Sequence, residues 1–72
     1  MSDNEQQVIT TGQRIRAARK KNGESLATVA ARAGLTIAQL CRIERDQVEA
    51  TVPTLRKIGK SLRVHWKRLV AE

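Results

Sequence analysis

Apolar residues recur at helical spacing along most of the chain beyond residue 10, and turn residues cut this pattern into short segments. The first segment covers about residues 12–21, where Ile15, Ala18 and Arg19 share one face. Asn22-Gly23 follows directly and ends the segment, because glycine readily takes the left-handed conformation that closes a helix. The pattern therefore predicts a first helix over residues 12–21.

Two further helices are predicted on either side of a tight turn at residues 34–36. Ser25 is a favourable N-cap for the first of them, and Gly34 ends it about nine residues later. Thr36 caps the second helix, which is expected to run to about residue 45. This second helix carries a narrow apolar stripe that consists of Ile37, Leu40 and Ile43.

The last third of the chain predicts a loop and two more helices. Residues 46–50 are expected to form the loop, Thr51 caps a fourth helix, and Pro53 is tolerated in its first turn. Arg63 interrupts the apolar pattern, after which a short fifth helix is expected to run to the end of the chain. The buried stripe of the fourth helix consists of Leu55, Ile58, Gly59 and Leu62.

No segment alternates between apolar and polar residues over a useful length, so the sequence contains no credible strand. The expected fold is all-α, with five short helices around one core. Residues 1–10 are expected to be a flexible tail and residues 11–72 a single domain. Cys41 is the only cysteine, so apolar packing must hold the fold, as is usual in a reducing cytoplasm. No apolar run approaches the ~20 residues that span a membrane.

The charge balance points to a polyanionic partner. The chain has 14 Lys and Arg against 7 Asp and Glu, a formal net charge of +7. Nucleic acid is the first candidate partner and an anionic membrane surface is the second. Trp66 is the only aromatic residue, so the chain lacks the stacking platform on which single strands and RNA are usually bound. Duplex DNA is therefore favoured.

Residues 25–45 have the layout of a DNA-binding helix-turn-helix, in which two short helices meet at a tight turn containing glycine. Residues in and around this unit agree in order and spacing with one known family: Gly12-Gln13-Arg14-Ile15-Arg16, Arg19, Ser25 with Ala33-Gly34-Leu35-Thr36, Ile43-Glu44-Arg45, Thr54-Leu55, Ile58-Gly59 and Leu62. The chain resembles the lambda-repressor-like family, also called the Cro or xenobiotic-response-element type. The resemblance covers about residues 12–70 and implies a five-helix domain whose third helix enters the major groove.

The resemblance also implies that the side chains after the Thr36 cap face the edges of the bases. Arg42 suits a bidentate hydrogen bond to guanine O6 and N7, whereas Ile37 and Ala38 suit contact with a thymine methyl group. Gln39 is placed to reach a base or a phosphate. The alternatives are that Arg42 is an ordinary solvated arginine, and that Ile37 and Ala38 only pack within the helix.

Phosphate contacts are expected on both sides of this helix, from basic side chains and from helix N-termini. Lys20 and Lys21 have the alternative of serving only solubility. The expected phosphate-binding residues are Arg16, Lys20, Lys21, Ser25, Thr36, Arg45 and Thr51.

In the family that the chain resembles, the residues matching Arg19 and Glu44 form an ion pair that orients the third helix. The chain departs from the family at Leu26, where a glutamine usually contacts a phosphate, and at Asp46, where a glycine is common. The loop at residues 47–49 has no Lys or Arg, although this loop often contacts phosphates in relatives. The grip on the DNA backbone is therefore expected to shift to Lys20, Lys21 and Arg45.

Family members frequently pair through the C-terminal region, and Trp66 has the alternative of belonging to the core. Two-fold pairing would place two half-sites of a palindromic operator about 34 Å apart. The residues expected at a dimer interface are Val64, Trp66, Leu69 and Val70.

The function expected from these features is that of a sequence-specific DNA-binding transcriptional regulator in the cytoplasm, associated with the nucleoid. It is expected to be a homodimeric repressor without cofactor, metal or small-molecule ligand, and the family resemblance suggests control of its own operon. The single His65 and the scattered acidic residues form no catalytic set, so no enzyme activity is expected. The alternatives are an antitoxin that binds a toxin as well as its own promoter, and a basic peptide of the membrane surface.

Overall fold

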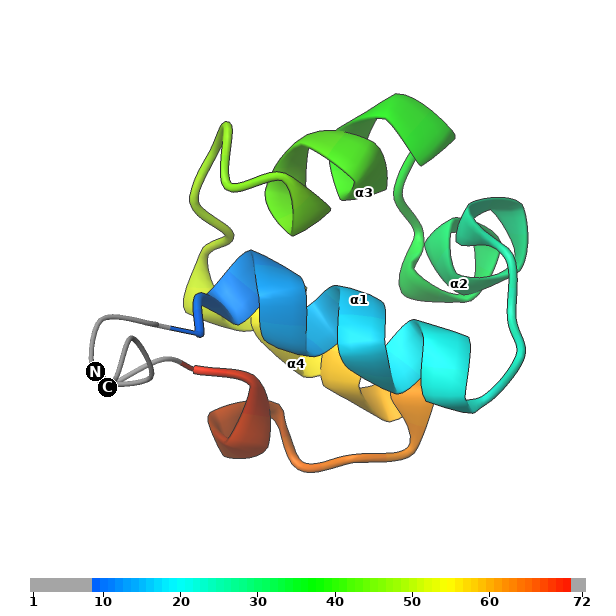
Figure 1. Ribbon diagram of the computed structural model, residues 1–72. Coiled ribbons are helices and arrows are strands. Elements are labelled where there is room, and N and C mark those ends of the chain that lie inside the picture. The colour runs from blue at the N-terminus through cyan, green and yellow to red at the C-terminus, as the bar shows by residue number, and fades with distance from the viewer. Residues whose placement is uncertain (1–8, 71–72) are drawn as a thin grey trace, which may run out of the picture.

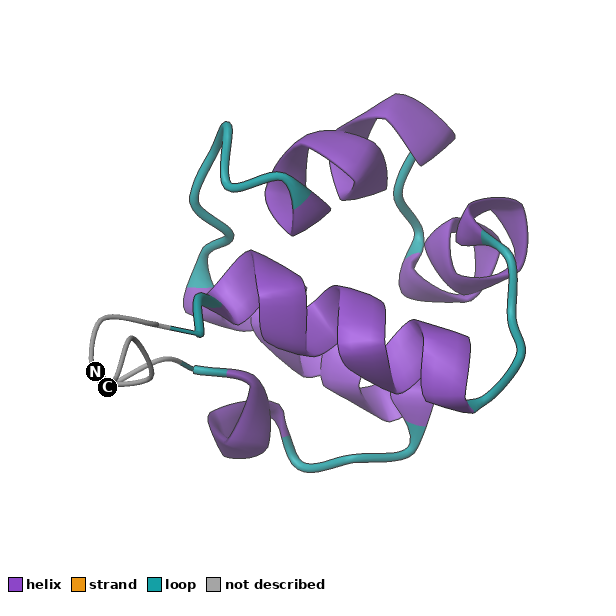
Figure 2. Ribbon diagram, in the orientation of Figure 1, coloured by secondary structure: helices purple, strands orange, loops and turns teal. Residues whose placement is uncertain are grey.

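The structure, a computed structural model, describes residues 9–70 and shows four α-helices and one short 3-10 helix (Figures 1 and 2). Residues 1–8 of the expected tail, and residues 71–72, lie outside the described residues. No strand occurs between residues 9 and 70, so the all-α class is confirmed. The elements in chain order are α1 (Thr11–Lys21), α2 (Leu26–Ala33), α3 (Ile37–Glu44), α4 (Val52–Leu62) and η2 (Trp66–Leu69).

Each α-helix begins after a serine or threonine whose side-chain oxygen accepts a hydrogen bond from a backbone N–H in the first turn. Ser25, Thr36 and Thr51 act in this way, as the sequence predicts. Thr10, which was expected in the tail, caps α1, and its backbone N–H donates to Gln13 Oε1 at 3.0 Å. The ordered domain therefore includes residue 10.

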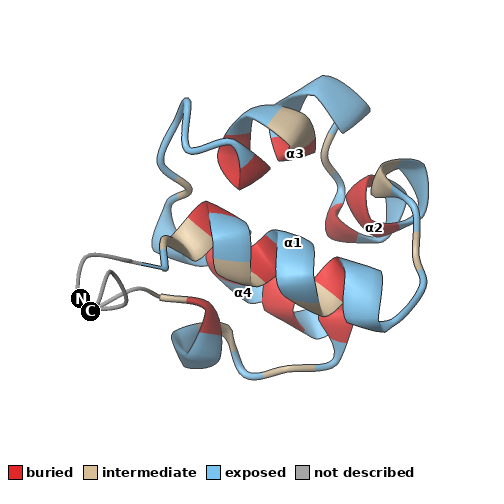
Figure 3. Cartoon of the chain, viewed as in Figure 1, coloured by how far each residue is buried: buried red, intermediate tan, exposed pale blue. Residues whose placement is uncertain are grey.

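The core lies where the four α-helices face one another (Figure 3). α1 and α4 lie side by side, with α3 on one side of them and η2 on the other (Figure 1). The buried apolar side chains are Ile15, Val29, Ala30, Ala33, Leu40, Ile43, Leu55, Ile58, Leu62 and Leu69.

Ile37 does not belong to the buried stripe of α3, contrary to the expectation from its spacing. It is 52% exposed, whereas Leu40 and Ile43 are buried. A step of three residues falls about 60° short of a full helical turn, so two such steps carry Ile37 about 120° away from Ile43. Only two of the three stripe residues therefore face the core.

The short fifth helix predicted at the end of the chain takes the form of the four-residue 3-10 helix η2, so a count of five α-helices is not confirmed. Arg63 takes a left-handed conformation with φ of 64° and ends α4. The chain then passes directly over Gly59, where an added Cβ would lie 2.8 Å from the carbonyl oxygen of Val64. Since Leu69 returns to the core only a few residues later, no room remains for a full α-helix.

Candidate nucleic-acid interface

α2 and α3 are joined by residues 34–36 and enclose an angle of 107°. This angle lies within the range of about 90–120° that is typical of DNA-binding helix-turn-helix units. Gly34 makes the turn possible with φ of 71°, and the Leu35 N–H donates to the Ala30 carbonyl at 2.9 Å. The turn predicted from the sequence is therefore confirmed, and it leaves the outer face of α3 uncovered (Figure 3).

No single helix among residues 9–70 has the length and apolar character needed to cross a bilayer. Only α2 and α3 taken together would qualify, and they are sharply bent against each other.

The outer face of α3 carries all four residues expected to read bases. Ile37, Ala38, Gln39 and Arg42 are exposed, and none of them supports the core. Gln39 has a second role, since its Oε1 accepts the Thr36 N–H at 2.8 Å and completes a capping box. Its amide nitrogen then remains the group with which Gln39 can donate a hydrogen bond outward.

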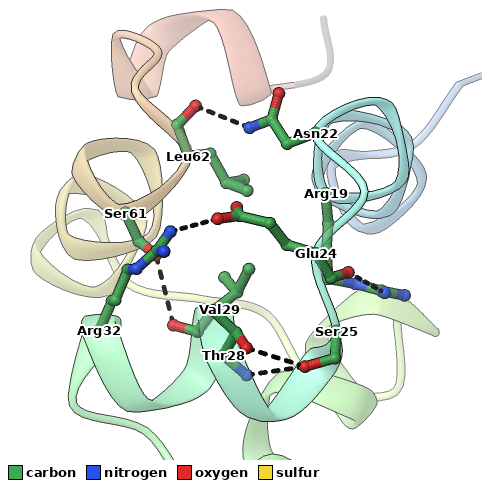
Figure 4. A network of polar contacts seen from close by, with 9 residues as sticks. All are labelled: Arg19, Asn22, Glu24, Ser25, Thr28, Val29, Arg32, Ser61 and Leu62. Carbon is green, nitrogen blue, oxygen red and sulfur yellow. Dashed lines mark hydrogen bonds and ion pairs between the residues drawn. The ribbon is translucent and has the colours of Figure 1, made fainter.

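A buried ion pair ties the end of α3 to α1. Arg19 Nε donates to Glu44 Oε2 at 2.7 Å, and Arg19 Nη2 donates to Glu44 Oε1 at 3.0 Å. Both residues are buried, and the hydrogen bond to Glu44 raises the pKa of Arg19, so that the guanidinium stays charged. Arg19 Nη1 also donates to the carbonyl of Glu24 at 3.0 Å, which fixes the loop before α2. One side chain thus contacts the end of α3 through Glu44 and the start of α2 through the Glu24 carbonyl, the second of which is drawn in Figure 4.

Asp46 forms a second link between α3 and α1 that the sequence did not reveal. Its Oδ1 accepts the Gly12 N–H at 3.1 Å and its Oδ2 accepts the Thr10 hydroxyl at 2.5 Å. The carboxylate therefore covers the N-terminus of α1, which favours negative charge. Asp46 has φ of 59°, and this left-handed conformation carries a steric cost that the two hydrogen bonds offset.

Backbone contact also brings α1 against α3. An added Cβ at Gly12 would lie 2.4 Å from the carbonyl oxygen of Ile43 and 2.6 Å from that of Glu44. Only glycine permits this approach, so the position of α3 is determined by the main chain as well as by side chains.

The residues expected to bind phosphates fall into groups around α3. Arg16 and Arg45 line one hollow of about 380 Å³ between α1 and α3. Arg42 and Thr51 line another of about 270 Å³ on the α4 side of α3. Lys20 and Lys21 are exposed at the other end of α1, and Ser25 and Thr36 stand at the starts of α2 and α3.

In two of these capping residues the hydroxyl proton is already used in a hydrogen bond within the protein. Ser25 Oγ donates to Thr28 Oγ1, and Thr51 Oγ1 donates to Thr54 Oγ1, each at 3.0 Å. A phosphate at these helix starts would therefore be bound through backbone N–H groups of the first turn.

The C-terminal residues expected at a dimer interface differ in how far the structure buries them and in what they contact. Leu69 is 3% exposed and belongs to the core of the single chain, so it is not available to a partner. Val64 and Trp66 are half-buried against the core, and the Arg56 guanidinium lies 5.6 Å from the Trp66 ring centroid. Val70 instead lines an apolar hollow of about 390 Å³ between the α3–α4 loop and the start of α1. The other apolar side chains of that hollow are Ile43, Val48, Ala50 and Leu55.

Residues 9–70 contain no group of three or more His, Cys, Asp or Glu side chains arranged to hold a metal ion.

Comparison with known proteins supports this geometry. Solved structures with similar folds include the restriction-modification controller protein C.AhdI from Aeromonas hydrophila. It is 28% identical, with a TM-score of 0.81 over 85% of this chain and 92% of that protein. The DNA-binding domain of SinR from Bacillus subtilis is 35% identical, with a TM-score of 0.76 over 82% of this chain and 87% of that one.

The P22 c2 repressor, solved in complex with a synthetic operator, is 28% identical, with a TM-score of 0.80 over 85% of this chain and 92% of that one. No curated protein sequence matches the chain. The sequence profile of the helix-turn-helix family HTH_3 matches residues 15–69. The chain therefore belongs to this helix-turn-helix family, and its predicted resemblance to the lambda-repressor-like family is confirmed.

Proposed function

We propose that the protein is a transcriptional regulator that binds duplex DNA in a sequence-specific way with α3 in the major groove. The observation that carries this proposal is the exposed face of α3, whose side chains are free of the core while a buried ion pair holds the helix. Structures of similar proteins support it, since P22 c2 was solved with a synthetic operator and SinR was solved with DNA.

In this proposal Arg42 reads a guanine, because its planar guanidinium can donate two parallel hydrogen bonds to O6 and N7. Ala38 and Ile37 lie toward the start of α3 and contact thymine methyl groups. Gln39 donates from its amide nitrogen to a base or a phosphate. Each well-formed bidentate pair contributes roughly 1–3 kcal/mol of discrimination between bases.

The test is to select binding sites from a random duplex library with the purified protein and to sequence them. Arg42→Ala should reduce the preference for one G·C pair roughly 5- to 150-fold and leave the far-ultraviolet circular dichroism unchanged. Arg68→Ala on η2 removes the same charge far from α3 and should keep the wild-type preference. Equal recovery of all sequences by the wild-type protein would refute sequence-specific recognition, and an unchanged preference in Arg42→Ala would refute the role of Arg42.

We further propose that the protein acts as a homodimeric repressor on a palindromic operator, and that it regulates its own operon. The apolar hollow around Val48, Ala50 and Val70 offers an interface, because Val48 is 47% exposed beside it. An operator-bound dimer would occupy a promoter and exclude polymerase. Sedimentation of the protein on a selected site should give two chains per duplex, and one chain per duplex would contradict the dimer.

A further inference from the structure

A strongly basic hollow lies away from the exposed face of α3, between α2 and α4. It has a volume of about 590 Å³ and is lined by Arg32, Lys57, Lys60 and Arg63, together with Ala33, Gly34 and Ser61. None of its four cationic residues belongs to the set expected to contact DNA around α3. We call it the basic hollow.

Residues 50–70 carry a large part of the positive charge of the protein. Residues 50–70 contain six Lys or Arg and no Asp or Glu, whereas residues 36–50, which include α3, contain two basic and three acidic residues. In Figure 1, α4 and η2 lie on the side of α1 that is turned away from α3. The segment that contains α3 therefore contributes little to the attraction for a polyanion, which comes from the other segments, residues 50–70 among them.

The cations of the basic hollow form a row on a rigid support. Lys57 and Lys60 lie three residues apart on α4, which corresponds to a rise of about 4.5 Å, and Arg63 follows as the left-handed residue that ends the helix. α4 is held to α2 by the hydrogen bond from Ser61 Oγ to the Val29 carbonyl at 3.4 Å (Figure 4). Arg32 is held toward the hollow's edge by its ion pair with Glu24.

The close spacing of these positive charges does not stabilise the fold. Like charges at three-residue spacing on one helix destabilise it, and a concentration of positive charge opposes the compact state. No acidic side chain lines the basic hollow, and of its four cations Arg32 has an ion pair, with Glu24, while no ion pair is found for Lys57, Lys60 or Arg63 among the described residues. A ligand with closely spaced negative charges would remove the repulsion.

The phosphate backbone of duplex DNA fits the basic hollow better than an acidic protein does. Duplex DNA carries one negative charge per about 1.7 Å of its axis, so several phosphates fall within reach of a short row of cations. A protein partner would also need an apolar centre to its interface. The exposed large apolar side chains, Ile9, Ile37, Val48 and Val52, all lie outside the basic hollow.

We propose that the basic hollow binds the backbone of a second segment of duplex DNA without reading its bases, while α3 reads the first. This contact goes beyond the proposed function, since it needs neither α3 nor a dimer. Through this second contact the protein would hold two DNA segments together or bring a flanking DNA segment around itself.

The experiment uses the whole chain labelled with nitrogen-15 and a random-sequence 12-bp duplex in low salt. Amide shifts should change in two separate groups, one in α3 and one around Gly34, Ser61 and Arg63. Lys57→Gln/Lys60→Gln should abolish the second group, preserve the first, and weaken binding of the second duplex at least tenfold. It should also lower the saturating ratio from two duplexes per chain to one.

Lys67→Gln/Arg68→Gln is the matched control, because it removes two charges from η2 outside the basic hollow and should keep both groups. Three results would overturn the inference: unchanged shifts around the hollow with duplex, shifts that persist in Lys57→Gln/Lys60→Gln, or a response to polyglutamate but not to duplex. The last result would assign the basic hollow to an acidic protein. Loss of the α3 shifts alone would instead contradict the proposed function and leave this inference standing.

Discussion

Replacing Glu44 by glutamine tests whether the buried ion pair holds the helix-turn-helix in place. The substitution keeps the shape of the side chain but leaves the Arg19 guanidinium buried without its counter-charge. Removing one partner of a buried pair costs about 3–5 kcal/mol. Glutamine retains one acceptor oxygen, and Arg19 still donates to the Glu24 carbonyl at 3.0 Å, so we expect the low end, about 3 kcal/mol. A domain of 72 residues has a total stability of about 4–11 kcal/mol, so this loss is a large share.

The assay is urea unfolding followed by circular dichroism and by the fluorescence of Trp66, the only aromatic side chain. With an m-value of about 1 kcal/mol/M, the midpoint for Glu44→Gln should fall by about 3 M. Glu49→Gln removes the same charge from an exposed loop position and should change stability by less than about 0.5 kcal/mol. Arg19→Met/Glu44→Met should recover most of the loss, because an apolar pair leaves no buried charge. A cost below about 1 kcal/mol for Glu44→Gln would refute the reasoning.

Two further substitutions test links described above. Asp46→Ala should lower the free energy of unfolding by about 1–2 kcal/mol in the same assay, because the Gly12 N–H and the Thr10 hydroxyl lose their acceptor. Asp46→Asn keeps an acceptor oxygen and should cost less. Equal costs for the two substitutions would contradict the role of Asp46 as a cap. Leu69→Ala should cost about 2–5 kcal/mol, because the side chain is buried in the core; a cost under 1 kcal/mol would show that η2 is not part of the cooperative fold.

The sequence predicted the helix starts well because caps are local. Ser25, Thr36 and Thr51 each accept a hydrogen bond from a residue three positions later, so the signal lies within one turn of the helix. Gly34 is local in the same sense, since its left-handed conformation needs no distant partner. The exposed residues of α3 were instead expected from the family resemblance, because the apolar spacing alone placed Ile37 in the buried stripe.

What the sequence did not reveal depends on residues far apart in the chain. Asp46 caps α1 from 34 residues away, and the local pattern showed only an aspartate where a glycine is common in the family. The basic hollow joins Arg32 of α2 to cations of α4, and no spacing rule relates them. The absence of a fifth α-helix depends on the passage of the chain over Gly59, which only the packed structure shows.

The main-chain contact at Gly12 helps to fix the position of α3 through residues other than those on its exposed face. Because backbone atoms, the Arg19–Glu44 pair and Asp46 orient the helix, Ile37, Ala38 and Arg42 can be exchanged without moving it. Exposed substitutions of this kind cost about 0.5 kcal/mol or less. Gln39 is the exception, because its side chain closes the capping box at Thr36. Under the proposed function, new operator preferences can therefore evolve on this scaffold by a few substitutions at three positions, while its fold is inherited unchanged.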